Sequence, residues 1–259
     1  MQFDDDLNAC AAAVERGDPD RFRAAMAAPV PARRVLFPIY AFNLEVARAP
    51  YVTQEPMIAQ MRLQWWADAL DEIASGGMVR RHEVATPLAL AVGPEGAELL
   101  RPAVEARRRD ADGSDPADAE DLEAYLSDTG GTLMWAAARA LGSAREARVR
   151  ALGTHLGFAN YLLAVPELLR RNRQPFPDMS PGAIGAAVRS RLPLRADPDL
   201  AERPDAGARV AELSAWRVPA ILARAARDPQ AVLDGRLGGS EAGARLSLML
   251  TAAGLRRLP

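Results

Sequence analysis

One pair of carboxylates in this chain has the spacing of a metal site. Asp68 and Glu72 lie four residues apart, so on a helix their side chains project from one face and can share a divalent cation. That face lies opposite an apolar stripe formed by Leu63, Trp66 and Leu70. The preferred interpretation is therefore a solvated polar face, with a metal role as the alternative.

The residues that bind zinc or form disulfides are scarce. The sequence holds His82, His155 and a single cysteine, Cys10, so a zinc site would need carboxylates to complete it. We expect both histidines to be structural or to lie on the surface. A lone cysteine excludes an internal disulfide and fits a reducing compartment.

The paired tryptophans and one asparagine can each be interpreted as ligand-binding residues or as core residues. Trp65 and Trp66 can line an isoprenoid-sized groove, although neighbours on a helix point about 100° apart and at least one should belong to the core. Asn160 can bind a ligand or satisfy a buried backbone group, and both interpretations stay open. Its helix also presents small residues, which allow close helix packing or leave a narrow cavity: Gly153, Gly157, Asn160 and Ala164.

Two arginine clusters stand out, at Arg107–Arg109 and at Arg170, Arg171 and Arg173. Cations near the C-terminus of a helix complement its dipole, and this is the preferred interpretation. The alternative is contact with anionic lipid or with an acidic partner.

Composition bounds the class of protein. Hydrophobic residues make up 49% and charged residues 25% of 259 residues, as in soluble globular proteins. The net charge of -2 gives no reason to expect nucleic-acid binding. The sequence contains no lysine, which excludes a Schiff-base lysine and a lysine-bearing phosphate loop. No apolar run approaches the roughly 18–20 residues of a membrane span, and the acidic start does not resemble a targeting segment.

Apolar residues recur at helical spacing, so we predict an all-α protein with one domain over residues 1–259. A mobile loop is expected at about residues 110–117, where acidic residues accompany Gly113 and Pro116. The predicted helices cover residues 18–28, 32–49, 55–73, 84–92, 96–109, 121–141, 144–171, 181–191, 207–226 and 239–255.

The order of several motifs resembles the squalene/phytoene synthase family, over about residues 10–177. The motifs are Tyr40–Glu45 (YAFNLE), Arg62–Trp66 (RLQWW), Leu156–Asn160 (LGFAN) and the arginine-rich Arg170–Pro177 (RRNRQPFP). This resemblance implies an isoprenoid-synthase-like helical bundle.

Members that condense prenyl diphosphates hold magnesium with two aspartate-rich motifs, and magnesium offsets the charge of the leaving diphosphate. In this chain the first motif falls on Ala47–Tyr51, which has no carboxylate, and the second on Ala164–Leu168, which keeps only Glu167. We call these two stretches the vacated segments. Pro166 should also bend the second helix, at a local cost of about 3 kcal/mol if unsupported.

The loss of both motifs is similar to the non-catalytic branch of the family that assists assembly of respiratory complex I. The resemblance implies no catalytic residue, no metal and no cofactor. It implies a protein partner in that assembly, a location in the cytoplasm at the inner face of a bacterial inner membrane, and peripheral membrane contact. Candidates for a vestigial binding groove are Tyr40, Asn43, Glu45, Arg48, Arg62, Trp65, Trp66, Asn160, Ala164, Glu167, Leu168 and Arg173.

Two alternatives stay open. The first is a divergent prenyl diphosphate-condensing transferase that recruits magnesium through Glu45, Asp68, Glu72 or Glu167. The second is a carrier that binds an isoprenoid or another lipid without turnover.

Overall fold

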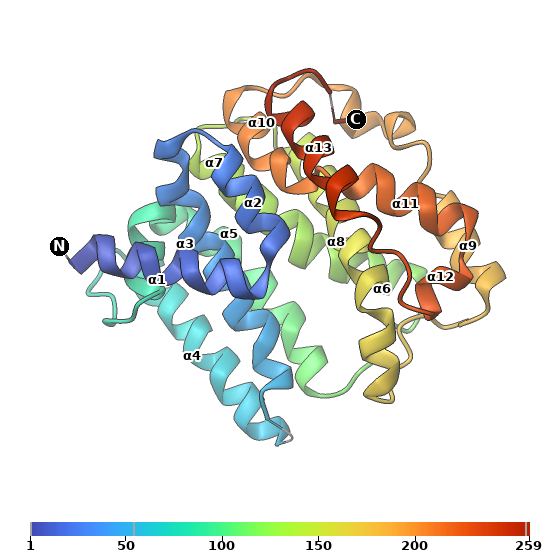
Figure 1. Ribbon diagram of the computed structural model, residues 1–259. Helices are drawn as coiled ribbons and strands as arrows, with labels where there is room; N and C mark the ends of the chain where they lie inside the picture. Colours follow the sequence, from blue (N-terminus) through green and yellow to red (C-terminus); the bar gives the residue numbers. More distant parts are fainter. Residues whose placement is uncertain (1, 54, 257) are drawn as a thin grey trace.

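The computed structural model describes residues 2–53, 55–256 and 258–259, and within those ranges it contains helices and no β-strand. The all-α prediction is therefore confirmed (Figure 1). The α-helices are α1 (Gln2–Gly17), α2 (Pro19–Ala27), α3 (Arg33–Arg48), α4 (Pro56–Ala74), α5 (Ala85–Ala111), α6 (Ala119–Leu126), α7 (Thr132–Ala140), α8 (Glu146–Arg170), α9 (Pro181–Arg189), α10 (Ala206–Glu212), α11 (Val218–Arg227), α12 (Gln230–Leu233) and α13 (Glu241–Ala252).

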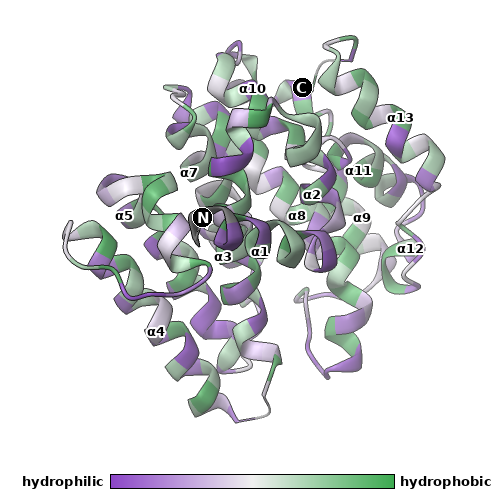
Figure 2. Cartoon of the chain, turned by 60° about the vertical axis from the view of Figure 1, so that its left-hand side comes forward, coloured by the Kyte–Doolittle hydropathy of each residue, from purple (hydrophilic) through white to green (hydrophobic). Residues whose placement is uncertain are grey.

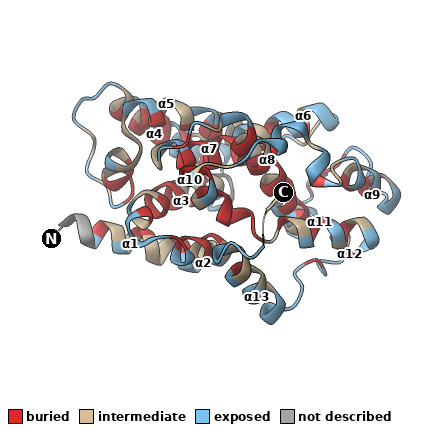
Figure 3. Cartoon of the chain, turned by 90° about the horizontal axis from the view of Figure 1, so that it is seen from above, coloured by how far each residue is buried: buried red, intermediate tan, exposed pale blue. Residues whose placement is uncertain are grey.

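The centre of the bundle is formed by α3, α5, α7 and α8. Helix α7 packs against α3, α5, α8 and α10, and its residues Thr132–Ala138 are all buried. The outer helices are far more exposed, as Figure 3 shows for α9, α12 and α13. In α13 only Leu248 is buried, because this helix rests on the bundle along one narrow edge.

Local signals at helix ends predicted several boundaries correctly. Asp18 caps α2 by accepting a hydrogen bond from the Arg21 amide at 3.0 Å, and Pro19 occupies the first turn. Gly93 separates the two predicted helices of residues 84–92 and 96–109, which form the two arms of α5. Its φ of 62° is a left-handed conformation that favours glycine and breaks the helical path.

Other boundaries differ from the prediction. The single helix expected over residues 207–226 is divided into α10, a 3-10 turn at Leu213–Ala215 and α11. Pro219 starts α11, since it lacks the amide that a continuous helix would use. The helix expected over residues 121–141 contains a π-helical turn, η3 (Ser127–Gly131), between α6 and α7. Helices α1 and α12 were not predicted.

Gly130 of η3 and Gly153 of α8 lie against each other and let the two elements pack closely. A Cβ on Gly130 would lie 2.5 Å from the Gly153 carbonyl oxygen, and a Cβ on Gly153 would lie 2.6 Å from the Gly130 carbonyl oxygen. Neither position can carry a side chain without moving backbone. The small-residue face of α8 thus serves close packing over its first part.

Most helices carry both polar and apolar residues, as the mixed colours in Figure 2 show. Helix α8 continues through Pro166 to Arg170. Among the residues that the structure describes, no helix has both the length and the apolar composition of a membrane span.

Candidate functional site

Two adjoining cavities open beside the vacated segments. The wide cavity, of about 630 Å³, lies between α2, α3, the α6–η3 segment and α8. The narrow cavity, of about 290 Å³, lies between the C-terminal ends of α3, α5 and α8. Ala47, Arg107, Tyr125, Tyr161 and Ala164 line both, so the two cavities meet at these side chains.

Helices α3 and α8 bring the two vacated segments to the same hollow. Ala47 from the first segment and Ala164 from the second line both cavities, and Tyr51, Glu167 and Leu168 line the narrow one. Magnesium prefers hard oxygen ligands, which the alanine methyls and the leucine side chain do not supply. The second part of the small-residue face of α8 therefore leaves a cavity rather than a helix contact.

A buried arginine occupies the junction of the two cavities. Arg107 donates to Asp110 Oδ2 at 3.0 Å and makes a short contact with the Tyr125 hydroxyl, which donates to the same carboxylate at 2.7 Å. Burial alone would lower the pKa of Arg107, but Tyr125 and Asp110 raise it overall. Burial raises the pKa of the Tyr125 hydroxyl well above its usual value. The guanidinium is therefore charged and the phenol neutral at physiological pH.

Further arginines hold the carboxylates around the narrow cavity. Arg173 donates through Nε to Asp115 Oδ1 at 2.7 Å and through Nη2 to the Ser114 carbonyl, so it links the segment after α5 to the end of α8. Arg171 donates to Glu167 at 2.7 Å, and its guanidinium lies 5.0 Å from the centre of the Tyr51 ring. This hydrogen bond lowers the pKa of Glu167.

Asp110, Asp115 and Glu167, the carboxylates that line the narrow cavity, therefore all form ion pairs with arginines. Among the residues that the structure describes, no group of three or more His, Cys, Asp or Glu side chains has an arrangement that could hold a metal ion. The arrangement can instead accommodate a ligand with an apolar body against Ala47, Ala164 and Leu168, and a polar end near Tyr125 and Tyr161.

The structure gathers about half of the groove candidates into these cavities. Asn43 and Asn160 line the wide cavity, Glu167, Leu168 and Arg173 the narrow one, and Ala164 lines both. The other candidates lie elsewhere. Tyr40 is buried beneath the Arg21 guanidinium, 5.6 Å from its ring centre, while Glu45 is half-buried and Arg48 and Arg62 are exposed.

The paired tryptophans belong to a separate aromatic cluster. Trp66 is 4% exposed and packs edge-on against Phe42, with 5.3 Å between ring centres. Trp65 packs on His82, and the Arg80 guanidinium lies 4.9 Å from its ring centre. Neither tryptophan lines the wide or the narrow cavity. The cluster joins α4 to the segment before α5.

The proposed magnesium ligands of the transferase alternative are held by other side chains. Glu72 of α4 accepts from Arg80, which follows that helix, at 2.6 Å, and Asp68 accepts from Gln64 within α4 at 2.7 Å. Glu167 lies at the end of α8 and pairs with Arg170 and Arg171.

Sequence reasoning did not name Tyr125, Tyr161 or Arg107 as groove residues. Arg107 and Tyr125 are 18 residues apart and sit on different helices, so no local spacing signals their contact. The one available signal was that Tyr125 and Tyr161 are tyrosines on helices otherwise rich in alanine and leucine.

The family model for squalene/phytoene synthase matches residues 14–202, and the chain belongs to that family. The fold is similar to that of a dehydrosqualene synthase solved with a ligand, with a TM-score of 0.78 at 13% identity, covering 98% of this chain and 97% of that one. At this identity the likeness shows the isoprenoid synthase fold alone.

Two other similarities are weaker. The squalene synthase HpnC from Alicyclobacillus acidocaldarius superimposes with a TM-score of 0.55 at 17% identity, covering 98% of this chain and 94% of that one. A Drosophila melanogaster protein, the NADH dehydrogenase (ubiquinone) complex I assembly factor 6 homolog, is 39% identical over 64 residues. The matched segment covers 24% of this chain and 19% of the length of that relative.

Proposed function

We propose that this member of the squalene/phytoene synthase family does not catalyse prenyl transfer and works by binding. The observation that supports this most directly is the state of the two vacated segments, which reach one hollow and present methyl groups there. Ionising a diphosphate requires compensation of its developing charge, commonly by magnesium on carboxylates. In the hollow, Arg107 holds Asp110, and Arg171 holds Glu167.

Incubation of the purified protein with a prenyl diphosphate and magnesium tests the loss of catalysis. We expect no pyrophosphate release above that of the substrate alone, because the acidic side chains at the cavity are already paired. An active dehydrosqualene synthase assayed in parallel controls for substrate quality. Magnesium-dependent release that scales with protein concentration would favour the transferase alternative.

We propose further that the protein assists assembly of respiratory complex I, by peripheral contact at the cytoplasmic face of a bacterial inner membrane. The support is the short similarity to the Drosophila protein whose name carries that role. Deleting the gene and resolving membrane complexes on native gels is the test. We expect less assembled complex I and recovery on re-expression, and normal complex I in the deletion strain would contradict the role.

A second candidate, an isoprenoid or lipid carrier, is favoured by the cavities themselves, whose volumes of about 630 and 290 Å³ suit an elongated apolar molecule. Mass spectrometry of organic extracts of the purified protein would detect a retained lipid. Ala164→Trp fills the junction and should reduce the lipid signal, whereas Leu169→Trp, at an exposed position five residues further along α8, should not. Equal lipid content in the two variants would contradict the carrier function.

A further inference from the structure

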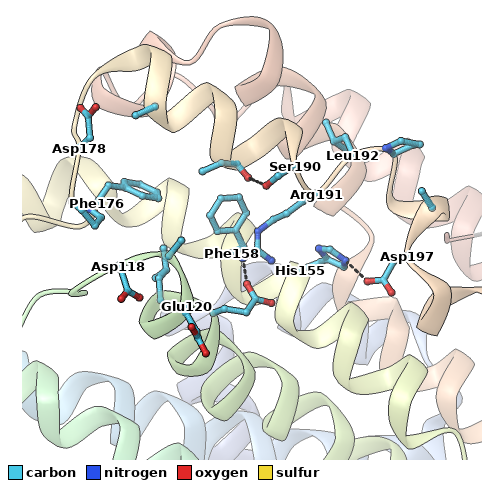
Figure 4. A pocket seen from close by; sticks show the side chains of 18 residues that line it. Asp118, Glu120, His155, Phe158, Phe176, Asp178, Ser190, Arg191, Leu192 and Asp197 are labelled. Atoms are coloured by element: carbon cyan, nitrogen blue, oxygen red, sulfur yellow. Dashed lines mark hydrogen bonds and ion pairs between the residues drawn. The ribbon is translucent and has the colours of Figure 1, made fainter.

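A third cavity lies on the opposite face of α8. We call it the α6–α9 groove: it has a volume of about 830 Å³ and is bordered by α6, α8, residues 176–178, α9 and residues 190–197 (Figure 4). His155 and Phe158 face it from α8, whereas Gly157, Asn160 and Tyr161 face the wide cavity. The helix thus separates the α6–α9 groove from the vacated segments.

The floor of this groove is apolar. Phe158 and Phe176 meet edge to face with 6.4 Å between ring centres, and Leu122 adds an aliphatic surface. Phe158 and Phe176 are 1% and 4% exposed, so both rings lie beneath the surface of the groove. Ala183 and Ala187 of α9 form the opposite wall, and their small size keeps the groove open.

The rim of the groove is strongly acidic. Five carboxylates line it: Asp118, Glu120, Glu123, Asp178 and Asp197. The single arginine in the lining, Arg191, is already paired with Glu123, and its guanidinium lies 4.1 Å from the centre of the Phe158 ring. The charge available to a ligand is therefore negative, above an aromatic base.

The groove continues into a second hollow, of about 460 Å³. The two share Glu120, Glu123, His155 and Asp197, and the second adds Asp199. Its one cation, Arg150, is held by Glu146 at 2.7 Å. An elongated acidic depression of this kind suits a segment of polypeptide better than a small cation.

Among the described residues, a buried histidine nitrogen lacks a hydrogen-bond partner where the α6–α9 groove meets the second hollow. The His155 side chain is 8% exposed, and its Nε2 lies 3.0 Å from Asp197 Oδ2. Because the carboxylate accepts, the proton of the neutral ring belongs on Nε2, which leaves Nδ1 as an acceptor. Within the described part of the chain, Nδ1 has no hydrogen-bond partner. His155 lines both hollows, so this unpaired acceptor lies at the wall that they share.

We propose that the α6–α9 groove binds a basic segment of a partner polypeptide. An aliphatic or aromatic side chain of that segment packs against Ala183, Ala187 and Leu192, above the buried phenyl rings. Its arginines or lysines pair with Glu120, Asp178 and the other rim carboxylates. Anionic lipid is disfavoured here, since the rim repels phosphate headgroups. The inference goes beyond the proposed function and does not depend on the identity of the assembled complex.

A direct binding measurement tests the groove. The probe is a fluorescein-labelled amphipathic peptide of about twelve residues, with leucines at helical spacing and arginines elsewhere, titrated with the full chain and followed by anisotropy at near-physiological salt. We expect it to bind at least about tenfold more tightly than an oligo-arginine of equal length or a peptide with glutamate in place of arginine. Equal affinity for the three peptides would overturn the proposal.

Matched variants locate the binding. Ala187→Trp fills the groove and should weaken binding of the arginine–leucine peptide at least about tenfold. Ala186→Trp, at the preceding, exposed residue of α9 outside the groove, should not. Glu120→Arg should weaken binding, whereas Glu98→Arg, at an exposed position on α5, should leave it unchanged.

Circular dichroism of the four variants controls for folding. Equal effects of the two tryptophan variants, or of the two charge reversals, would assign binding to the general acidity of the surface and overturn the proposal. Co-sedimentation of the unlabelled protein with anionic vesicles that is lost in Ala187→Trp but kept in Ala186→Trp would assign the groove to lipid and would also overturn the proposal.

Discussion

At the scale of single residues, Arg148 illustrates how a buried charge organises distant segments. Its side chain and that of Glu212 are both 3% exposed, and Arg148 Nε lies 2.7 Å from the Glu212 carboxylate. It also donates to the carbonyls of Leu200, Glu202 and Pro259. One guanidinium therefore joins α8 to α10, to the segment before it and to the end of the chain.

Removing this guanidinium should be costly. Arg148→Ala leaves Glu212 buried without its partner, and we expect the free energy of unfolding to fall by about 3–5 kcal/mol. Arg150→Ala removes an arginine two residues away that is partly exposed, pairs with Glu146 and donates to the Thr132 hydroxyl at 3.1 Å, and should cost about 1–2 kcal/mol. Urea denaturation of both variants measures the difference, and similar losses would contradict this account of the pair.

His155 predicts a pH dependence of stability. Burial lowers its pKa below 6.5, partly offset by the hydrogen bond with Asp197. A depressed pKa means that the native state binds this proton less readily than the unfolded chain, so the contribution is present above pH 6.5 and is lost as the pH falls through the native pKa. His155→Gln should flatten the decline of stability between about pH 6.5 and pH 5. Parallel curves for the two proteins would refute this assignment.

At the scale of secondary structure, η3 and α8 can pack closely because glycines without side chains lie where they cross. Gly130 and Gly153 place backbone against backbone, since a Cβ on Gly153 would lie 2.6 Å from a carbonyl oxygen. Gly157, one turn further along α8, is less crowded, because a Cβ there would lie 3.4 Å from its nearest neighbour. The two glycines of α8 therefore tolerate an added methyl group differently.

We expect Gly153→Ala to destabilise the protein by about 1–3 kcal/mol, because the added methyl forces η3 away from α8. Gly157→Ala should be near neutral, since its contact distance is ordinary and alanine gains up to about 1 kcal/mol in helix propensity. Thermal unfolding of the two variants is the measurement. A loss of stability in Gly157→Ala as large as that in Gly153→Ala would show that helix separation is not the cause.

At the scale of the whole molecule, the fold contains a hollow in which arginines pair with the carboxylates. Helices α3, α5 and α8 converge on the wide and narrow cavities, but Arg107 and Arg173 hold Asp110 and Asp115 there. In the described residues no cluster of acidic, histidine or cysteine side chains has metal-binding geometry. Cation binding by the native state should therefore contribute nothing to its stability.

Magnesium should leave the unfolding temperature unchanged. A ligand that binds only the native state raises its stability in proportion to RT ln(1 + [L]/Kd), so about 5 mM magnesium should shift the midpoint if a site of millimolar or better affinity exists. Sodium chloride at matched ionic strength controls for screening, and EDTA controls for metal retained during purification. A rise of several degrees with magnesium alone would reveal a site and favour the transferase alternative.

Much of the fold followed from the sequence because its signals are local. Asp18 and Pro19 mark the start of α2, and Gly93 marks the break in α5, through side chains and dihedral angles that act within one helical turn. The division of residues 207–226 into α10 and α11 was not predicted, although Pro219 gave a local signal for it. Helix α1 was missed because the three aspartates at residues 4–6 favoured a flexible acidic terminus, although acidic residues also suit the first turn of a helix.

By itself the sequence determined which ligands the vacated segments lack, because a carboxylate missing from Ala47–Tyr51 is missing in any fold. It also determined the helical class, through the spacing of apolar residues. Only the tertiary structure decided which arginine pairs with which carboxylate, that Trp65 and Trp66 line neither the wide nor the narrow cavity, and that different residues of α8 line the wide cavity and the α6–α9 groove. These are contacts between helices, and no periodicity within one helix encodes the residue that a neighbouring helix will present.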